Sequence, residues 1–139
     1  MDSISKERRS WNMSRIGGRN TGPEKRVRSL LHRMGYRFSL RRKDLPGRPD
    51  IVLPRFAAVI FVHGCFWHRH RHCSNSVLPK TRPEFWNAKL TGNAKRDKRN
   101  ISALKSLGWT PIVVWECELK NEAEVSRRLQ KQLDDLPNA

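Results

Sequence analysis

The apolar residues of this sequence follow two spacings, and the first is helical. Between Thr21 and Gly35, four apolar residues recur at intervals of three or four, as in a helix that buries one face: Val27, Leu30, Leu31 and Met34. Thr21 and Glu24 have the spacing of a capping box, so the simplest role for Glu24 is to cap this helix. Gly35 marks the end of the helix.

Short runs of β-branched and aromatic residues follow the second spacing and predict strands. Residues 36–40 alternate, residues 50–53 follow a proline-containing turn, and residues 57–62 are continuously apolar. The last two runs are separated by a short turn, so they should form a hairpin. Residues 109–115 are a further apolar run and predict another buried strand.

Three helical stretches complete the pattern. Residues 84–90 and residues 93–107 are expected as two successive helices, the second with Ile101, Leu104 and Leu107 on one face. A C-terminal amphipathic helix is marked by Val125, Leu129 and Leu133. The order helix, strands, helix, strand, helix predicts an α/β domain with a central mixed sheet flanked by helices on both sides.

Composition limits the chain to one folded domain. Its 139 residues, 37% of them hydrophobic, suffice for a single core. Residues 1–20 are polar and basic and are expected to form a flexible arm that orders on its target, leaving 21–139 as the domain. No apolar segment suits a membrane span or a signal peptide, so a cytoplasmic location is expected.

The charge of the chain is strongly positive and unevenly distributed. The formal net charge is +16, and residues 1–115 hold 25 Lys and Arg against 7 Asp and Glu, whereas residues 116–139 hold 4 against 6. Such a basic excess concentrates polyanions and gives salt-dependent binding through counterion release. A membrane surface is a poorer candidate, because no basic helix with an aromatic face is evident. Nucleic acid is therefore the expected partner.

The segment HGCFWHRHRHC, residues 63–73, holds four of the five histidines and two of the three cysteines. Cys65, His70 and Cys73 supply thiolate and imidazole ligands of the kind zinc prefers, and Cys117 is the one cysteine left for a fourth position. The alternative is a polar loop that is rich in histidine by chance. An odd number of cysteines without an export signal argues against disulfides and favours a metal site.

A second set of residues near this segment suits phosphodiester hydrolysis. Asp50 is the only carboxylate between Asp44 and Glu84, at the start of a predicted strand, and it offers the oxygen ligand that Mg²⁺ requires. It could instead be a turn residue or an ion-pair partner of Arg48. His63 and His68 titrate near neutrality and can act as base or acid if no metal holds them.

Aromatic residues flank the same segment. Phe66, Trp67 and Trp86 could insert between base pairs, because apolar wedges unstack base steps near a basic surface. The alternative is that all three belong to the core, a reading that is strongest for Trp86 because of its helical spacing.

Five motifs occur together in this chain: GRPDIV at 47–52, VIFVHGCFWHRH at 59–70, PKTRPEFW at 79–86, the run Lys89, Asn93, Arg96 and Asp97, and GWTPIVVWECEL at 108–119. In combination they closely resemble the very-short-patch repair (Vsr) DNA mismatch endonucleases, over residues 9–120. The resemblance implies a fold similar to restriction endonucleases, with a structural zinc. It also implies an enzyme that nicks one strand 5′ to the thymine of a T·G mismatch arising from deamination of 5-methylcytosine.

The resemblance also implies roles for individual residues. Asp50 and the backbone carbonyl of Val62 would bind the catalytic Mg²⁺, with Glu24, His63 and His68 completing the catalytic site and His68 the stronger candidate for activating water. The remaining implied roles are zinc ligation by Cys65, His70, Cys73 and Cys117, intercalation by Phe66, Trp67, Trp86, Met13 and Ile16, and DNA contacts by Lys89 and Asn93.

Some positions depart from the pattern. His72 is an alternative to His70 as zinc ligand, although the spacing from Cys65 favours His70. Residues 62–64 are Val-His-Gly where many restriction-like nucleases have Glu-x-Lys, which leaves histidine chemistry in place of lysine.

The expected substrate is double-stranded DNA with a T·G mismatch, cut by a monomer with functional links to a cytosine-5 methyltransferase and downstream repair proteins. A zinc-containing DNA-binding module without catalysis and a nuclease that cuts both strands of unmodified sites are the rival readings. The first leaves Asp50, His63 and His68 unexplained, and the second has no need of aromatic wedges.

Overall fold

A computed structural model describes residues 22–136, apart from residues 41, 71–72 and 74–76. The predicted N-terminal arm lies outside the described residues, as do Met13 and Ile16, the capping residue Thr21 and the alternative zinc ligand His72.

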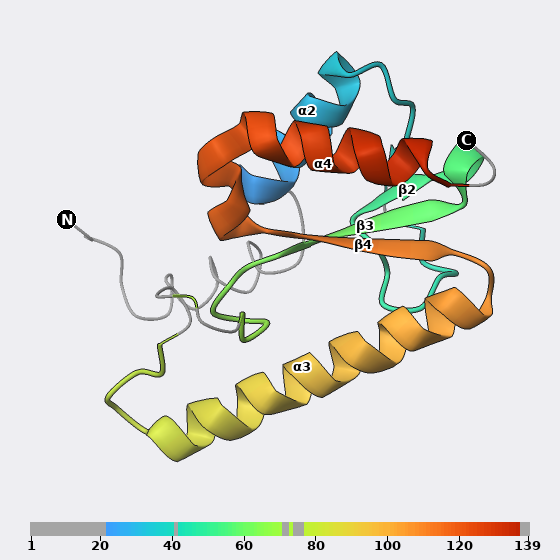
Figure 1. Ribbon diagram of the computed structural model, residues 1–139. Coiled ribbons are helices and arrows are strands. Elements are labelled where there is room, and N and C mark those ends of the chain that lie inside the picture. The colour runs from blue at the N-terminus through green and yellow to red at the C-terminus, as the bar shows by residue number, and fades with distance from the viewer. Residues whose placement is uncertain (1–21, 41, 71–72, 74–76, 137–139) are drawn as a thin grey trace.

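Four strands form one mixed sheet in the order β1-β2-β3-β4 (Figure 1). Strands β1 (Ser39–Leu40), β2 (Ile51–Leu53) and β3 (Ala58–His63) pair antiparallel in succession, and β3 pairs parallel with β4 (Thr110–Trp115). A 3₁₀ turn at Pro54–Phe56 joins β2 to β3. The predicted hairpin is therefore confirmed, and so is the mixed sheet.

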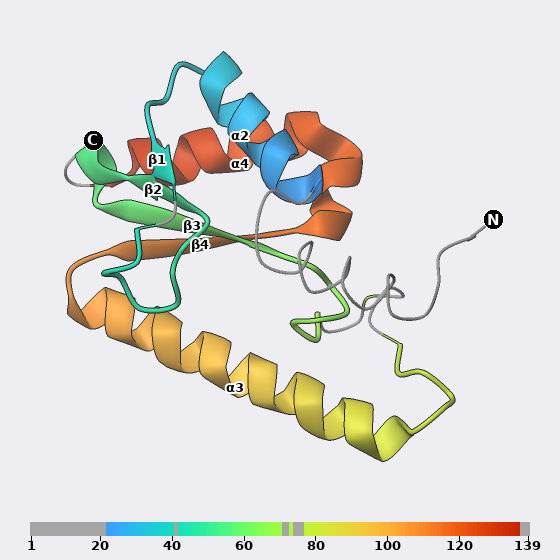
Figure 2. The same cartoon turned by 180° about the vertical axis from the view of Figure 1, so that it is seen from behind.

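Helices cover both faces of the sheet, as the order of elements predicted (Figure 2). Helix α2 (Gly22–Arg33) and helix α4 (Glu122–Asp134) lie on one face, and helix α3 (Pro83–Ser106) lies on the other. A 3₁₀ segment, η3 (Glu116–Asn121), connects β4 to α4. Successive strand residues point to opposite faces, so β2, β3 and β4 contribute to both layers, whereas both residues of β1 are exposed.

The two layers differ in size. The larger core packs the apolar faces of α2 and α4 against one face of the sheet, and its members are Val27, Leu30, Leu31, Ile51, Leu53, Ala58, Ile60, Val62, Ile112, Val114, Leu119, Val125, Leu129 and Leu133. The smaller core, under α3, is formed by Leu45, Val52, Val59, Phe61 and Leu104. Helix α3 is therefore held by few apolar contacts, and much of its surface is free for other uses.

Helix α3 corrects two details of the sequence prediction. The two helices expected at residues 84–90 and 93–107 are one continuous helix of 24 residues, which runs through Gly92. Leu107, expected on the buried face, is 61% exposed, whereas Leu104 is fully buried.

No helix in the described part of the chain, α3 included, is long and apolar enough to cross a lipid bilayer.

Candidate active site and metal cluster

A cleft of about 840 Å³ opens between the first turn of α2, the end of β3 and helix α3. Polar side chains from all three elements line it. The residues predicted for catalysis are all among them: Glu24, Asp50, His63 and His68. The tertiary fold thus gathers into one cavity residues that are spread over 45 positions of sequence, from 24 to 68.

Asp50 lies at the start of β2 and is held by the neighbouring strand. Its Oδ2 atom accepts a hydrogen bond of 2.7 Å from the backbone N–H of Val62 on β3. Burial, with a smaller contribution from the negative charge of Glu24, raises the pKa of Asp50 to about 7 in spite of that hydrogen bond. A carboxyl group in this setting fits a cation, because a positive charge would offset the cost of its ionisation.

Glu24 is in the first turn of α2, only 7% exposed, and it forms an ion pair of 3.6 Å with Arg28. The residue faces the cleft and acts electrostatically on Asp50. Glu24 is thus buried beside a second carboxylate in the cleft, and both its catalytic role and its capping role stay predictions.

The two histidines of the cleft stack against each other. The ring centroids of His63 and His68 are 3.9 Å apart and the rings are 2° from parallel. His63 is 5% exposed, and its Nδ1 atom has no hydrogen-bond partner among the described residues. Burial lowers the pKa of His63 to about 4, with a further contribution from His68, so His63 is neutral at pH 7.

His68 is oriented by a carboxylate that the sequence analysis did not assign. Its Nδ1 atom is 2.6 Å from Oδ2 of Asp97 on α3. Asp97 occurs in one of the motifs behind the family resemblance, but it is 29 residues from His68, and no local spacing links the two. Only the return of α3 along the cleft brings them together.

The predicted zinc ligands also meet in space. One ligand atom from each of Cys65, His70, Cys73 and Cys117 lies within 4.8 Å of the other three. Tetrahedral zinc with Zn–S bonds of about 2.3 Å needs ligand atoms about 3.8 Å apart, and separations of at most 4.8 Å among two classes of zinc ligand, thiol and imidazole, suit a metal ion. Cys65 and His70 belong to the loop after β3, whereas Cys117 belongs to η3.

Neighbouring groups hold this cluster in place. The backbone N–H of Cys65 donates to Oε1 of Glu116 at 3.1 Å, and the ring of His70 stacks on Trp115 with centroids 4.1 Å apart. The backbone N–H of His70 donates to the carbonyl of Cys65 at 2.9 Å. The cluster thereby fastens the loop after β3 to the end of β4.

The predicted wedge residues form one aromatic cluster beside the cleft. Ring centroids of Phe66, Trp67 and Trp86 are 5.2 to 5.9 Å apart, in edge-to-face contacts, and Phe85 adds to Trp86 at 5.3 Å. None of the four is fully buried, and Phe85 is 44% exposed. These residues are therefore not part of the core, which removes the alternative reading for Trp86.

Lys89 and Asn93 lie on the face of α3 that lines the cleft. The Nζ atom of Lys89 is 6.0 Å from the ring centroid of Trp67 and 5.9 Å from that of Trp86. Asn93 donates from Nδ2 to the backbone carbonyl of Trp67 at 3.1 Å. Both residues thus join the helix to the aromatic cluster.

The fold has a counterpart among solved structures. The catalytic domain of the homing endonuclease I-Bth0305I superposes with a TM-score of 0.57, covering 81% of this chain and 93% of that domain, at 24% sequence identity. The fold of this chain is therefore similar to that of this domain.

Sequence comparisons define the family to which the chain belongs. The family profile described as DNA mismatch endonuclease Vsr matches residues 1–75. The DNA mismatch endonuclease Vsr of Escherichia coli K12 is 46% identical over 125 residues, 90% of this chain and 80% of the relative. The chain belongs to the Vsr family of DNA mismatch endonucleases, as its motifs indicated, and is accordingly a hydrolase that acts on DNA.

Two nicking enzymes are similar over nearly their whole length. The type II nicking enzyme V.XorIIP of Xanthomonas oryzae pv. oryzae is 51% identical over 96% of this chain and 97% of its own length. The type II nicking enzyme V.NmeAIP of Neisseria meningitidis is 40% identical over 99% of this chain and 98% of its own length. The chain therefore spans these two relatives almost completely.

Proposed function

We propose that this protein nicks one strand of duplex DNA 5′ to the thymine of a T·G mismatch, in a Mg²⁺-dependent hydrolysis. The observation that carries the proposal is the meeting of Asp50, His63 and His68 in one cleft, directly beside the aromatic cluster of Phe66, Trp67 and Trp86. A binding module would need only the aromatic cluster and the positive charge.

Asp50 and the backbone carbonyl of Val62 are the protein ligands we assign to Mg²⁺. The fit rests on the buried carboxyl of Asp50 and its neighbour Glu24. Ionising Asp50 beside a second carboxylate is unfavourable, which raises its pKa, and a divalent cation would offset that cost. When bound, Mg²⁺ supplies Lewis acidity for the negative charge that develops on the phosphate.

His68 is the residue we assign to activating water. With Nδ1–H donating to Asp97, the Nε2 atom is left as an acceptor that can take a proton from water. His63, neutral and stacked on His68, restricts the orientation of that ring. Asp97 acts through His68 and is a positioning residue.

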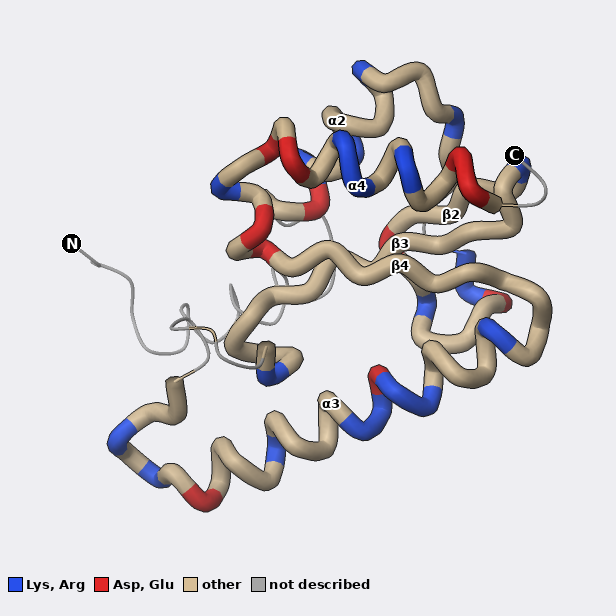
Figure 3. The backbone as a smooth tube through the Cα atoms, viewed as in Figure 1, with Lys and Arg blue, Asp and Glu red and all other residues tan. Residues whose placement is uncertain are grey.

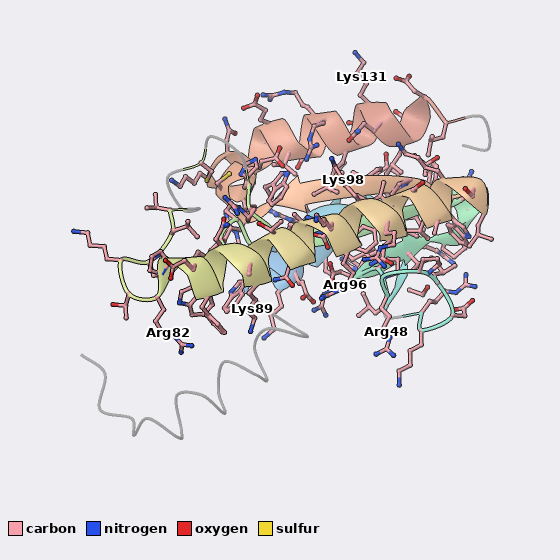
Figure 4. All side chains as sticks on the ribbon, turned by 90° about the horizontal axis from the view of Figure 1, so that it is seen from below. Arg48, Arg82, Lys89, Arg96, Lys98 and Lys131 are labelled. Atoms are coloured by element: carbon pink, nitrogen blue, oxygen red, sulfur yellow. The ribbon has the colours of Figure 1, made fainter. Side chains whose placement is uncertain are left out.

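The DNA is expected to run along α3. Four basic side chains lie along one side of this helix in Figure 4: Arg82, Lys89, Arg96 and Arg48. Lys89 and Arg96 are seven residues apart, about two helical turns, which places them along one face of the helix, and Arg82 directly precedes the first helical residue, Pro83. Arg48, Lys89 and Arg96 also line the cleft, so a phosphate backbone that followed this row would pass the catalytic residues.

The aromatic cluster and the metal cluster have separate roles in this proposal. Phe66, Trp67 and Trp86 insert beside the mismatch, where weaker base pairing lowers the cost of unstacking. Lys89 and Asn93 would contact bases there. Zinc at Cys65, His70, Cys73 and Cys117 would be structural, because the four protein ligands complete its coordination and leave no open position.

The wider biological setting is part of the same proposal. Deamination of 5-methylcytosine produces T·G mismatches, so the enzyme would work after a cytosine-5 methyltransferase and before downstream repair proteins. We propose that it acts as a monomer on DNA in the cytoplasm.

Nicking of labelled duplexes tests the proposal. Duplexes labelled on either strand, with a T·G mismatch or fully matched, are incubated with and without Mg²⁺, and the cut site is mapped. We expect one Mg²⁺-dependent nick 5′ to the mismatched thymine, and a loss of about 10³-fold or more in Asp50→Asn with DNA binding retained.

A matched control and two contrary outcomes complete the test. Asp44→Asn alters a carboxylate in the same loop that is 62% exposed and paired with Arg42, so it should leave nicking unchanged. Tight binding without any nick would favour a binding module. Cutting of both strands in matched DNA would favour an enzyme of the restriction type.

A further inference from the structure

The loop of residues 64–70, which follows β3, carries residues of several functions in seven positions. Phe66 and Trp67 belong to the aromatic cluster, His68 lines the cleft, and Cys65 and His70 belong to the metal cluster. Arg69 is the one charged side chain of this loop, and neither the catalytic site nor the metal cluster uses it.

Arg69 is fastened to helix α3. Its Nη1 atom donates to Oδ1 of Asn87 at 2.5 Å and to Oγ1 of Thr91 at 2.9 Å. Asn87 and Thr91 are four residues apart, so they present their oxygens on one face of the helix. The backbone of Arg69 has a positive φ of 52°, which is uncommon for residues other than glycine.

The residues on both sides of Arg69 contact the same helix. Asn93 donates to the carbonyl of Trp67, and Asp97 pairs with His68. Between Asn87 and Asp97, α3 therefore meets the loop through a series of polar contacts, whereas in this half of the helix only Leu90 is fully buried.

This half of α3 also carries part of the aromatic cluster. Figure 1 shows the N-terminal part of α3 extending beyond the sheet, on the side where the loop after β3 lies. Trp86 comes from the helix, while Phe66 and Trp67 come from the loop. The cluster keeps its form only if the helix and the loop keep their relative position. Among the contacts that bridge them, those of Arg69 reach Asn87 and Thr91, on either side of Leu90 and next to Trp86 in the helix.

We infer that Arg69 is a positioning residue for mismatch recognition. By bridging the loop to Asn87 and Thr91, it holds the aromatic cluster assembled before DNA arrives and sets His68 at its distance from Asp97. The inference rests on the proposed function for its consequence on DNA, but the bridge itself concerns the free protein. Preorganisation of this kind lowers the ordering cost of binding.

The first test compares Arg69→Ala and Thr91→Val with wild type. Binding is measured for mismatched and matched duplexes over a range of salt concentrations. We expect both variants to lose roughly tenfold in affinity for the mismatched duplex, the usual scale for a lost hydrogen bond to a charged group, with little change for the matched one. Arg99→Ala, which removes an exposed positive charge from the same helix, should leave the ratio between the two duplexes unchanged.

The salt dependence separates positioning from direct phosphate contact. An arginine that bound a phosphate would, once removed, weaken both duplexes alike and lower the slope of log affinity against log salt by about one. Thr91→Val removes no charge, so a phosphate-contact role for Arg69 predicts no effect from it. Equal weakening of both duplexes by Arg69→Ala, or an unchanged ratio in Thr91→Val, would overturn the inference.

Hydrogen exchange of the free protein tests the bridge independently of DNA. Amides of residues 68–70 should exchange faster in both variants while the metal content stays equal to that of wild type, and unchanged exchange would overturn the bridge. If Arg69→Ala loses its metal, the DNA-binding comparison and the hydrogen-exchange comparison are both decided on Thr91→Val alone. A wild-type protein that does not distinguish the two duplexes would contradict the proposed function, and the exchange data would still decide the role of Arg69.

Discussion

The pKa values of Asp50 and His63 are shifted in opposite directions by the same physical cause, burial. Burial disfavours the charged form of each group, so the pKa of Asp50 rises to about 7 and that of His63 falls to about 4. The neutral imidazole and the readily protonated carboxyl leave the cleft short of positive charge at its centre. A cation bound by Asp50 would supply that charge.

The stability of the Mg²⁺-free protein should therefore depend on Asp50. Because the folded-state pKa of about 7 lies above the ordinary aspartate value of 3.8, the folded protein binds more protons between these values, and its stability falls as pH rises through that window. Asp50→Asn removes this penalty and should raise the free energy of unfolding at pH 8 by roughly 2 to 4 kcal/mol. Urea denaturation of both proteins at pH 5 and pH 8 measures the difference.

The contrast between the two pH values is the decisive observation. At pH 5 the Asp50 carboxyl of the folded protein is largely protonated, so Asp50→Asn should have a smaller effect there. An equal gain at both pH values would mean that packing, not ionisation, causes it. Mg²⁺ should stabilise wild type at pH 8 and leave Asp50→Asn unaffected.

Cys117 should contribute to folding through the metal cluster. It is the one ligand of the four from outside residues 65–73, so it closes the cluster between the loop after β3 and η3. We expect Cys117→Ser to lose bound zinc and to unfold at a temperature several degrees lower, because zinc binding contributes free energy to folding. Metal analysis and thermal unfolding test this, and full zinc content in the variant would exclude Cys117 as a ligand.

Helix α3 combines weak packing on the sheet with strong functional use. Only Leu90 and Leu104 are buried along its 24 residues, yet it supplies Lys89, Asn93 and Asp97 to the cleft. A helix with so few apolar contacts depends on its intrinsic helix propensity more than α2 or α4 does. Gly92, in its middle, is the weakest position in that respect.

Replacing Gly92 should therefore stabilise the protein. A Cβ atom at this position meets nothing within 4 Å, and the residue is helical, so Gly92→Ala should raise the free energy of unfolding by about 0.5–1 kcal/mol. Gly108 is the matched control: it also has open space around a Cβ, but its φ of 90° is unfavourable for alanine, so Gly108→Ala should destabilise. Urea denaturation of both variants measures this, and a loss of stability in Gly92→Ala would contradict it.

The charge of the whole molecule is arranged around α3. Figure 3 shows Lys and Arg along this helix, while Asp and Glu gather where η3 leads into α4. Glu122 in that acidic region pairs with Arg26 and Arg33 of α2, so its carboxylate is engaged within the protein. Glu122 therefore offers no free charge to repel DNA, and of the acidic residues in η3 and α4 only Glu116 lines the cleft.

Two positive charges on α3 should differ in their effect on DNA binding. Arg96 lies in the basic row and lines the cleft, whereas Lys98 lies on another side of the helix in Figure 4. Arg96→Ala should weaken binding to matched and mismatched duplexes alike and lower the salt slope by about one. Lys98→Ala should change both much less, and equal effects of the two variants would contradict a path along this face.

Local patterns in the sequence determine most of the architecture. Apolar residues at helical spacing predict that α2 and α4 each bury one face, and continuous apolar runs predict that β2 and β3 are buried on both. The hairpin of β2 and β3 requires only a short turn between them. Local sequence also reveals three of the predicted zinc ligands, because Cys65, His70 and Cys73 lie within nine residues. The motifs that carry the family resemblance are likewise visible in the sequence alone. Helix α3 was expected as two helices because the interruption at Gly92 is local, whereas contacts of the flanking turns with the loop after β3 stabilise it as one.

Only the tertiary structure decided how the site is assembled. The pairing of His68 with Asp97, the approach of Glu24 to Asp50 and the bridge from Arg69 to Thr91 join residues 22 to 29 positions apart, on different elements. These contacts form because α2 and α3 pack beside the ends of the strands. The same packing buries Asp50 and His63 and thereby shifts their pKa values. Spacing along the chain carries no information about either, because both depend on which elements pack against each other.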